Sequence, residues 1–451
     1  MYDQKKFTDA VKYFGMVTGT EANDAKHLML YGQACIAAKD EFKAYQLFKQ
    51  LANVTPKDPA VFEKLYDLAQ RAGTKDDVFN YLKTYTTLQP SDAEAQKKLG
   101  DMLLERKDDR GALNAYRAAL KANPKIKGIF KNYAVLVMSY GQESEKEVAL
   151  QGAVASGEAD AKMYAALGDI YTKKGLPDKA IAAYDKASQL DPKNDKLLSA
   201  LAKNQVKKGA ISDAIATYEQ VIALNPRAEA ELKELGNLYL RQKKDSQALT
   251  YFKKYLDKKP DDSEVSFIVG EASFKQKNYA DAVKYFGMVR GETERKPSFI
   301  RMYGDACYEN KDNPRALVQY QRLAKLTPKD ASVYKRLYEI NMKSGATRDG
   351  LSNLRTYTRF MPKDAKAQKE LGDLLYDQKN KEEALTAYRK ALSADPKIKG
   401  FYKNYVSLVL AAPRAPDKMN ALKGAIAAGE ADAFARSLIE GTLKGRVVDT
   451  A

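Results

Sequence analysis

The sequence predicts an all-α solenoid of antiparallel helix hairpins, and three observations support this fold. A pattern of apolar, small and polar residues returns every 34 residues along almost all of the 451-residue chain. Within each period, two stretches place apolar or small residues at helical spacing, so that these residues share one stripe of an α-helix. A short polar turn joins the two stretches. Because one hairpin cannot bury both stripes alone, stacked hairpins must share a continuous core.

Residues 93–126 show the repeating unit most clearly. Leu99 and Leu103 mark the apolar stripe of its first helix, and Ala112 and Tyr116 mark that of its second helix. Full units begin at residues 25, 59, 93, 127, 161, 195, 229, 263, 297, 331, 365 and 399. A chain of this length would ordinarily suggest about three globular domains, but the unbroken period favours one array.

The period divides the chain into three predicted parts. Residues 1–24 match a second helix without its first helix, residues 25–432 hold the twelve full units, and residues 433–451 are expected to form a C-terminal capping helix and tail. We therefore interpret Met1 as the start of a piece of a longer protein, and a signal peptide, a lipid anchor and further repeats are the open alternatives for what precedes it. Localisation stays open between the cytoplasm and a bacterial envelope or periplasm.

Small residues at fixed positions predict close packing inside each hairpin. The eighth position is commonly Gly or Ala and the twentieth is commonly Ala, which lets the two helices approach closely. In the unit that starts at 331, Tyr338 takes the eighth position and Gly350 the twentieth. We interpret this exchange as a volume swap across one contact.

The loops between units predict helix caps. A proline ends many second helices, and an Asp or Asn follows it just before the next first helix, where its side chain can cap the backbone. The residues expected to act in this way are Asp58, Asp92, Asn194, Asp262, Asp330 and Asp364.

Two longer regularities overlie the 34-residue period. Residues 9–16 recur as 281–288, 124–128 as 396–400 and 157–161 as 429–433, each 272 residues later (281 − 9, 396 − 124, 429 − 157), which equals eight units. Duplication of an eight-unit block is the simplest explanation.

The pattern also breaks at every fourth unit. The partial first unit and the units at 127, 263 and 399 lack the stop proline and end in glycine-containing acidic segments. In the unit at 399, Pro413 and Pro416 also predict an irregular turn. We interpret the breaks as structural adjustments of the array, ahead of sequence drift and of partner docking.

The period and the spaced small, aromatic and proline positions resemble the tetratricopeptide repeat family. The family's usual tryptophan is absent, and the fourth position holds residues such as Leu28, Phe62, Phe130, Tyr164 and Tyr402. The resemblance implies a right-handed superhelix whose first helices line a groove that binds protein segments.

Carried onto this sequence, the resemblance implies a groove of mixed charge. Its candidate protein-binding residues are Lys97, Asp101, Lys131, Asn132, Lys233, Asn237, Arg301, Asp305, Lys335, Glu339, Lys369, Asp373, Lys403 and Asn404. A lysine and an acid four residues apart can instead pair within one helix. Ligand contact and local stabilisation therefore remain equal alternatives. Some members of the family bind the terminal carboxylate of a peptide, and others hold an extended peptide with asparagines in successive units. The residues that either kind of binding needs are incomplete in this sequence.

The inventory of reactive side chains argues against catalysis. The single histidine, His27, is expected to be exposed, and Cys35 and Cys307 occupy the same position eight units apart, as small core residues rather than a disulfide. These residues offer no transition-metal cluster and no histidine-based triad. We expect no cofactor, no metal and no enzyme activity.

The leading hypothesis is therefore a noncatalytic scaffold that binds a peptide segment or several protein partners, as part of a bacterial multiprotein assembly. The alternative is a basic binder of RNA or another polyanion, because the net charge is +17 and Tyr308 and Tyr376 offer stacking surfaces. However, acids are interspersed with the lysines along the chain, which makes nucleic acid the less favoured partner. Self-association is a third possibility. No apolar run is long enough to span a membrane.

Overall fold

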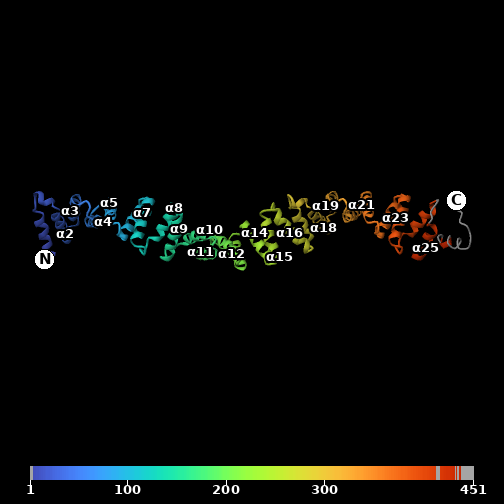
Figure 1. Ribbon diagram of the computed structural model, residues 1–451, viewed down its shortest axis with the longest axis horizontal. Helices are drawn as coiled ribbons and strands as arrows, with labels where there is room; N and C mark the ends of the chain where they lie inside the picture. The colour runs from blue at the N-terminus through green and yellow to red at the C-terminus, as the bar shows by residue number, and fades with distance from the viewer. Residues whose placement is uncertain (1–3, 413–416, 432, 434–435, 438–451) are drawn as a thin grey trace. The chain divides into compact units, whose positions relative to one another are not determined.

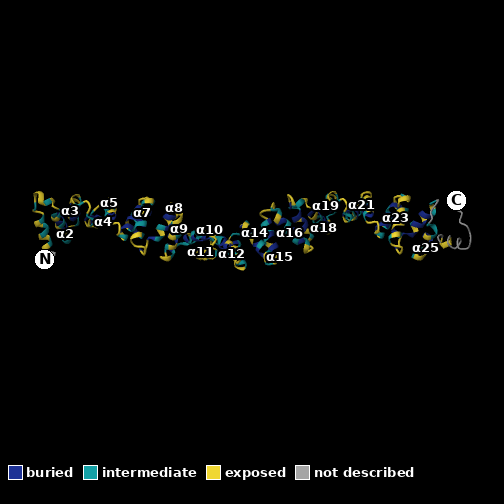
Figure 2. Ribbon diagram, in the orientation of Figure 1, coloured by how far each residue is buried: buried dark blue, intermediate teal, exposed yellow. Residues whose placement is uncertain are grey.

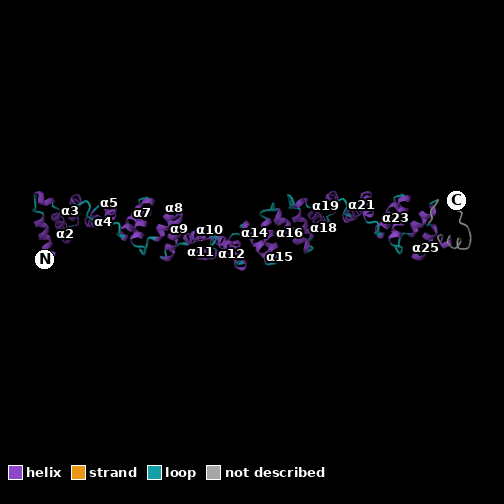
Figure 3. Cartoon of the chain, in the orientation of Figure 1, coloured by secondary structure: helices purple, strands orange, loops and turns teal. Residues whose placement is uncertain are grey.

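The fold is described from a computed structural model, which covers residues 4–412, 417–431, 433 and 436–437. Regular structure in these residues is helical, without a strand (Figure 3). The chain separates into two units, residues 1–231 and 232–451, and each is described by itself. Pro413, Pro416 and Asp432 lie outside the described residues, as does the predicted capping helix over 433–451 apart from Ala433, Arg436 and Ser437.

The first unit contains thirteen described α-helices and one 3₁₀ helix. They are α1 (Gln4–Phe14), η1 (Gly19–Asn23), α2 (Ala25–Ala37), α3 (Glu41–Val54), α4 (Pro59–Ala72), α5 (Lys75–Leu88), α6 (Ala93–Glu105), α7 (Asp109–Ala122), α8 (Phe130–Tyr140), α9 (Glu143–Ala155), α10 (Ala161–Lys173), α11 (Pro177–Leu190), α12 (Asp195–Lys208) and α13 (Ile211–Leu224).

The second unit continues the same alternation of helices. Its described helices are α14 (Glu229–Arg241), which begins at the boundary, α15 (Asp245–Leu256), α16 (Ser263–Lys275), α17 (Tyr279–Phe286), η2 (Thr293–Arg295), α18 (Pro297–Glu309), α19 (Asn313–Leu326), α20 (Ala331–Lys343), α21 (Thr347–Phe360), α22 (Ala365–Asp377), α23 (Lys381–Ala394), α24 (Tyr402–Ala411) and α25 (Lys418–Ala428).

Each helix packs mainly against its neighbours in the sequence. From α1 to α13, and again from α15 to α25, every helix contacts the helix that follows it (Figure 1). Buried residues lie where neighbouring helices face each other, and exposed residues lie on their outer surfaces (Figure 2). This consecutive packing is the hairpin solenoid that the sequence predicts.

The central contact of most hairpins is an aromatic ring resting on a glycine. The ring stands at the twenty-fourth position of the unit and the glycine at the eighth. A Cβ atom added to Gly100 would lie 2.5 Å from Tyr116 Cε1, and one added to Gly236 would lie 2.5 Å from Phe252 Cε1. The rings at this position are also among the largest fully buried side chains: Phe48, Tyr116, Tyr218, Phe252, Phe286, Tyr320 and Tyr388.

Four units replace the aromatic ring with leucine and fill the eighth position with a larger residue. The pairs are Tyr66 with Leu82, Ala134 with Leu150, Tyr338 with Leu354, and Val406 with Leu422. Our interpretation of Gly350 as the partner in the volume swap was wrong. The atom nearest to a Cβ added to Gly350 is Met342 Sδ, at 2.8 Å, rather than an atom of Tyr338. Tyr338 lies instead in one buried cluster with Leu354.

The predicted helix caps are confirmed with one exception. Five aspartates accept a hydrogen bond of 3.0–3.1 Å from a backbone N–H two or three residues later: Asp58, Asp92, Asp262, Asp330 and Asp364. Asn194 makes no such bond, because its Nδ2 donates to Asp191 Oδ2 at 2.9 Å.

The four break segments each contain a glycine that the backbone requires. Gly19, Gly157, Gly291 and Gly429 have φ between +74° and +79°, in the left-handed region that side-chain-bearing residues rarely adopt. The first and third breaks also contain the 3₁₀ helices η1 and η2.

Both cysteines are buried free thiols, as the sequence predicts. His27 is less exposed than expected. Helix α1 packs on α2, and the imidazole ring lies against Phe14 and Tyr31, with ring centroids 5.6 and 5.8 Å away.

We expect Gly100→Ala to lower the free energy of unfolding of its hairpin by about 1–2 kcal/mol, because the added methyl group must displace the Tyr116 ring. This value is the net loss, after subtraction of the gain of about 1 kcal/mol that helix propensity alone would provide. Hydrogen exchange of the α6 and α7 amides measures the effect. The control is Gly304→Ala, where the nearest atom would lie at 3.2 Å and stability should hold. Equal stabilities of the two variants would contradict this packing model.

We also expect stability to fall in alkaline solution. Tyr85 donates to Asp92 at 2.8 Å and Tyr357 to Asp364 at 2.7 Å. Burial, followed by these hydrogen bonds, raises the pKa of both phenols from 10.0 to about 12. A raised folded-state pKa means that the stabilisation is complete below pH 10 and is lost as the pH rises through 12.

Chemical denaturation at a series of pH values measures this loss. The variant Y85F/Y357F should be less stable at neutral pH by about 1 kcal/mol per hydrogen bond and should decline less between pH 10 and 12. The control is Tyr13→Phe, since the Tyr13 side chain is 69% exposed. The prediction fails if the double variant and the wild type decline in parallel.

Candidate functional site

The candidate binding residues lie on one face of the first helices, which we call the first-helix face. It comprises the second, fifth, sixth, ninth, twelfth and thirteenth positions of each unit. The fourteen predicted residues come from α6, α8, α14, α18, α20, α22 and α24, so they are distributed along both units. The structure brings them together in small groups rather than as one site.

The ninth-position aspartates are held by tyrosines of the core. Tyr116 Oη donates to Asp101 Oδ1 at 2.6 Å, and Tyr388 Oη donates to Asp373 Oδ1 at 2.8 Å. The equivalent Tyr320 donates to Asp305. Burial, followed by the bond to the aspartate, raises the pKa of all three phenols. These candidate acids therefore stabilise their own hairpins.

Most fifth-position cations reach the loop that leads into the next hairpin. Lys233 Nζ lies 2.7 Å from Asp262 Oδ2, and Arg301 pairs with Asp330. Lys97 Nζ donates to the Lys127 carbonyl oxygen at 3.0 Å, 30 residues later.

Of the candidate cations, Lys369 pairs with an acid four residues later, Asp373, at 2.8 Å. Among the candidate cations, one therefore pairs within its own helix. More of them reach the loop before the next hairpin. At Asp262, burial alone would raise the pKa, but hydrogen bonds from Lys233, the Val265 N–H and Tyr255 together hold the pKa below its ordinary value.

The remaining candidates divide between engaged and accessible side chains. Lys335 Nζ lies 5.6 Å from the centre of the Tyr357 ring, and Glu339 accepts from Arg336 at 2.8 Å. Asn132 Nδ2 lies 3.5 Å from Tyr116 Oη, and Asn404 hydrogen-bonds to Tyr388. Asn237 is half-buried, and Lys403 is exposed.

Sequence reasoning missed an apolar patch on α8. Val135 is 53% exposed and Met138 is 36% exposed, and both share a helical stripe with Lys131, whose side chain is 58% exposed. Val135 occupies the ninth position, where most units carry an acid. Its unit has Leu150 rather than tyrosine at the twenty-fourth position, so no phenol there needs an acceptor. The apolar residue at the ninth position, together with leucine at the twenty-fourth, was the sequence signal that could have revealed this patch.

Of the two tyrosines predicted to offer stacking surfaces, Tyr376 is half-buried against the core, and Tyr308 is already covered by cations. Arg336 lies 4.1 Å and Lys343 Nζ 4.3 Å from the centre of the Tyr308 ring, and Lys343 also donates to Tyr308 Oη at 2.7 Å. A nucleotide base would have to displace these cations to stack on the ring.

The described residues offer neither a metal site nor a membrane span. No group of three or more His, Cys, Asp or Glu side chains in them is placed to hold a metal ion. None of the described helices is both long and apolar enough to cross a bilayer.

Comparison with known proteins identifies the repeat. Family models described as tetratricopeptide repeat match residues 79–125, 171–235, 205–266 and 365–398. The small glutamine-rich tetratricopeptide repeat-containing protein 2 of Mycosarcoma maydis is 31% identical over 108 residues, which is 23% of this chain and 30% of that protein. The match thus spans less than a third of that curated relative.

Solved structures of repeat proteins are similar at low identity. One is a tetratricopeptide repeat protein from Parabacteroides merdae, at 17% identity and a TM-score of 0.30, covering 55% of this chain and 98% of that one. Another is the TPR2AB domain of yeast Sti1 in its pHSP90 complex, at 19% identity and a TM-score of 0.32, covering 56% and 98%. The family models, the 34-residue period and the consecutive hairpins show that residues 79–125, 171–266 and 365–398 contain tetratricopeptide repeats.

Proposed function

We propose that this chain is a noncatalytic scaffold that binds segments of other proteins on its first-helix face, with the α8 patch as the main anchor. The observation that carries the proposal is the exposed pair Val135 and Met138 beside Lys131. Apolar side chains left exposed on a preformed helical surface are typical of peptide-binding faces. Burying the exposed parts of this pair would contribute about 1 kcal/mol per side chain.

The charged candidates supply orientation rather than most of the affinity. Lys131 is largely exposed, and its Nζ lies 4.0 Å from Asp160, so it remains accessible to a partner carboxylate. Lys403 is exposed at the equivalent position of α24. Exposed charge pairs of this kind contribute less than about 1 kcal/mol each and mainly select the partner.

The intramolecular pairing of the face favours a protein partner over a polyanion. Phosphate binding needs cations that are free of neighbouring acids, whereas Lys233, Arg301 and Lys369 each contact a carboxylate. A polyanion would have to compete for each of these lysine or arginine side chains.

Selection of peptides from a displayed random library against the immobilised chain tests the proposal. We expect the selected peptides to bind the V135D/M138D variant at least about tenfold more weakly than the wild type, because the variant removes an apolar anchor. Fluorescence anisotropy of the labelled peptides measures the affinity.

The matched control is Val318→Asp on α19, a second helix. Val318 is 51% exposed, against 53% for Val135, but it lies off the first-helix face. Affinity should be unchanged in this variant. Selected peptides that bind V135D/M138D and the wild type equally would refute the role of the α8 patch.

A further inference from the structure

Two similar hollows, one in each unit, lie beside the loops that precede α8 and α24. The first is a hollow of about 700 Å³ between residues 124–127 and α9. The second, of about 270 Å³, lies between residues 396–399 and α25. Both are bordered by the same five-residue loop sequence, Pro-Lys-Ile-Lys-Gly, which starts at Pro124 and again at Pro396.

Each loop is held in one conformation by hydrogen bonds. Gly128 has φ +70°, and its N–H donates to Glu158 at 3.0 Å, while the Lys131 N–H donates to the same carboxylate at 3.1 Å. The residue before α8, Ile129, makes no side-chain cap, so Glu158 replaces the cap from the far end of the hairpin.

The second loop repeats this arrangement. Gly400 has φ +86°, and Glu430 accepts from the Gly400 N–H at 2.5 Å and from the Tyr402 N–H at 2.7 Å. Ile126 and Ile398, at the middle of the two loops, are buried at 2% and 8% exposure. Both loops therefore present their lysines from a fixed backbone.

The walls of the hollows are mostly apolar, and Gln151 and Ser156 also line the first hollow. Phe130 and Tyr402 rest on glycines of the opposite helix, where a Cβ added to Gly152 or Gly424 would lie 2.5 or 2.6 Å from the ring. Val148 lines the first hollow and is 68% exposed. The space is therefore bordered by apolar groups that are open to solvent.

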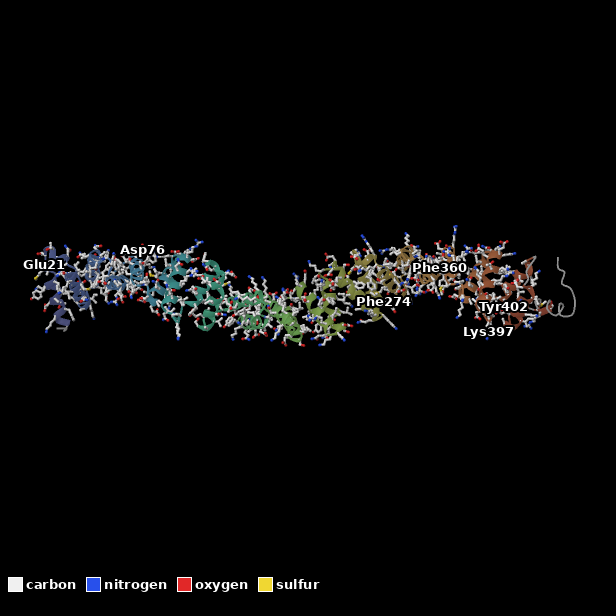
Figure 4. All side chains as sticks on the ribbon, in the orientation of Figure 1. Glu21, Asp76, Phe274, Phe360, Lys397 and Tyr402 are labelled. Atoms are coloured by element: carbon white, nitrogen blue, oxygen red, sulfur yellow. The ribbon has the colours of Figure 1, made fainter. Side chains whose placement is uncertain are left out.

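Lysines form the outer edge of each hollow. Lys125, Lys127, Lys397 and Lys399 are exposed, and no ion pair among the described residues involves any of the four. The acids close to the first hollow are engaged elsewhere, since Glu158 accepts two backbone N–H groups and Glu147 pairs with Lys174. Figure 4 labels Lys397 and Tyr402, which line the second hollow.

We propose that each hollow binds an acidic peptide segment of a partner protein, with one apolar side chain in the hollow and flanking carboxylates on the two lysines. Charge complementarity selects the acidic segment, and the apolar walls select a peptide over a nucleic acid, which would need a continuous basic stripe. The chain then has two such sites, which are lined by other residues than the α8 patch of the proposed function.

The test uses the full chain and the fluorescein-labelled peptide Asp-Asp-Asp-Phe-Asp-Asp-Asp at low ionic strength, where exposed charge contacts are least screened. We expect two peptides per chain for the wild type. The K125E/K127E and K397E/K399E variants should each bind one. The variant with all four changes should bind at least about tenfold more weakly. Val148→Asp should weaken the first site when the second is already removed by K397E/K399E.

The matched control reverses four other lysines that also follow a stop proline: Lys57, Lys193, Lys329 and Lys363. These are exposed as well but border none of the described hollows, so affinity should change by less than about twofold. Circular dichroism confirms that each variant is folded, and Lys→Gln changes at the four tested positions replace any that is not.

Several outcomes would overturn the proposal. The proposal fails if the wild type does not bind the peptide, or if the control variant loses as much affinity as the variant with all four changes. It also fails if the wild type binds a peptide with asparagine in place of aspartate equally well. Binding of single-stranded RNA, but not of the peptide, through the same four lysines would also overturn it.

Discussion

The contact between an aromatic ring and a bare backbone holds most hairpins of this protein together. A ring such as Tyr116 lies against Gly100, where a methyl group would overlap it. The glycine costs helix propensity, but it brings the two helices close enough to bury the ring completely. Where leucine replaces the ring, as at Leu354, a larger eighth residue fills the remaining space. The combined volume of the two side chains is therefore similar in both kinds of hairpin.

The same ring also determines part of the chemistry of the first-helix face. A buried tyrosine hydroxyl needs an acceptor, and the ninth position supplies it, as Asp101 and Asp373 do. Cations at the fifth position, such as Lys233, are directed to the next hairpin's capping aspartate. Much of the face that resembles a ligand groove therefore serves the folding of the array, and an apolar unit such as α8 stands out against it.

Some of the break segments cap a helix over a longer distance, in addition to the ordinary caps that Asp24 and Asp160 provide. In two of them, Glu158 and Glu430 return from the end of a hairpin to the backbone at its start. This bond closes each hairpin on itself and holds the lysine-bearing loop before it. Identical five-residue loops with equivalent geometry, 272 residues apart (396 − 124), indicate that the duplication preserved this device as a whole.

The 34-residue period by itself determined the helices, their pairing, the type of repeat and the buried thiols, because local spacing and residue size specify a hairpin without reference to distant contacts. It also located the capping aspartates, since a cap acts within three residues. The partners of polar side chains, both within and between units, were beyond its reach. Packing decides which side chains come together. It brings Lys233 to Asp262 and the Tyr116 hydroxyl to Asp101. It also directs Asn194 to Asp191 instead of a cap, and Glu158 to the Gly128 N–H. Only the tertiary structure decided these contacts, because a long side chain can reach several partners and the competition among them is settled by neighbouring hairpins.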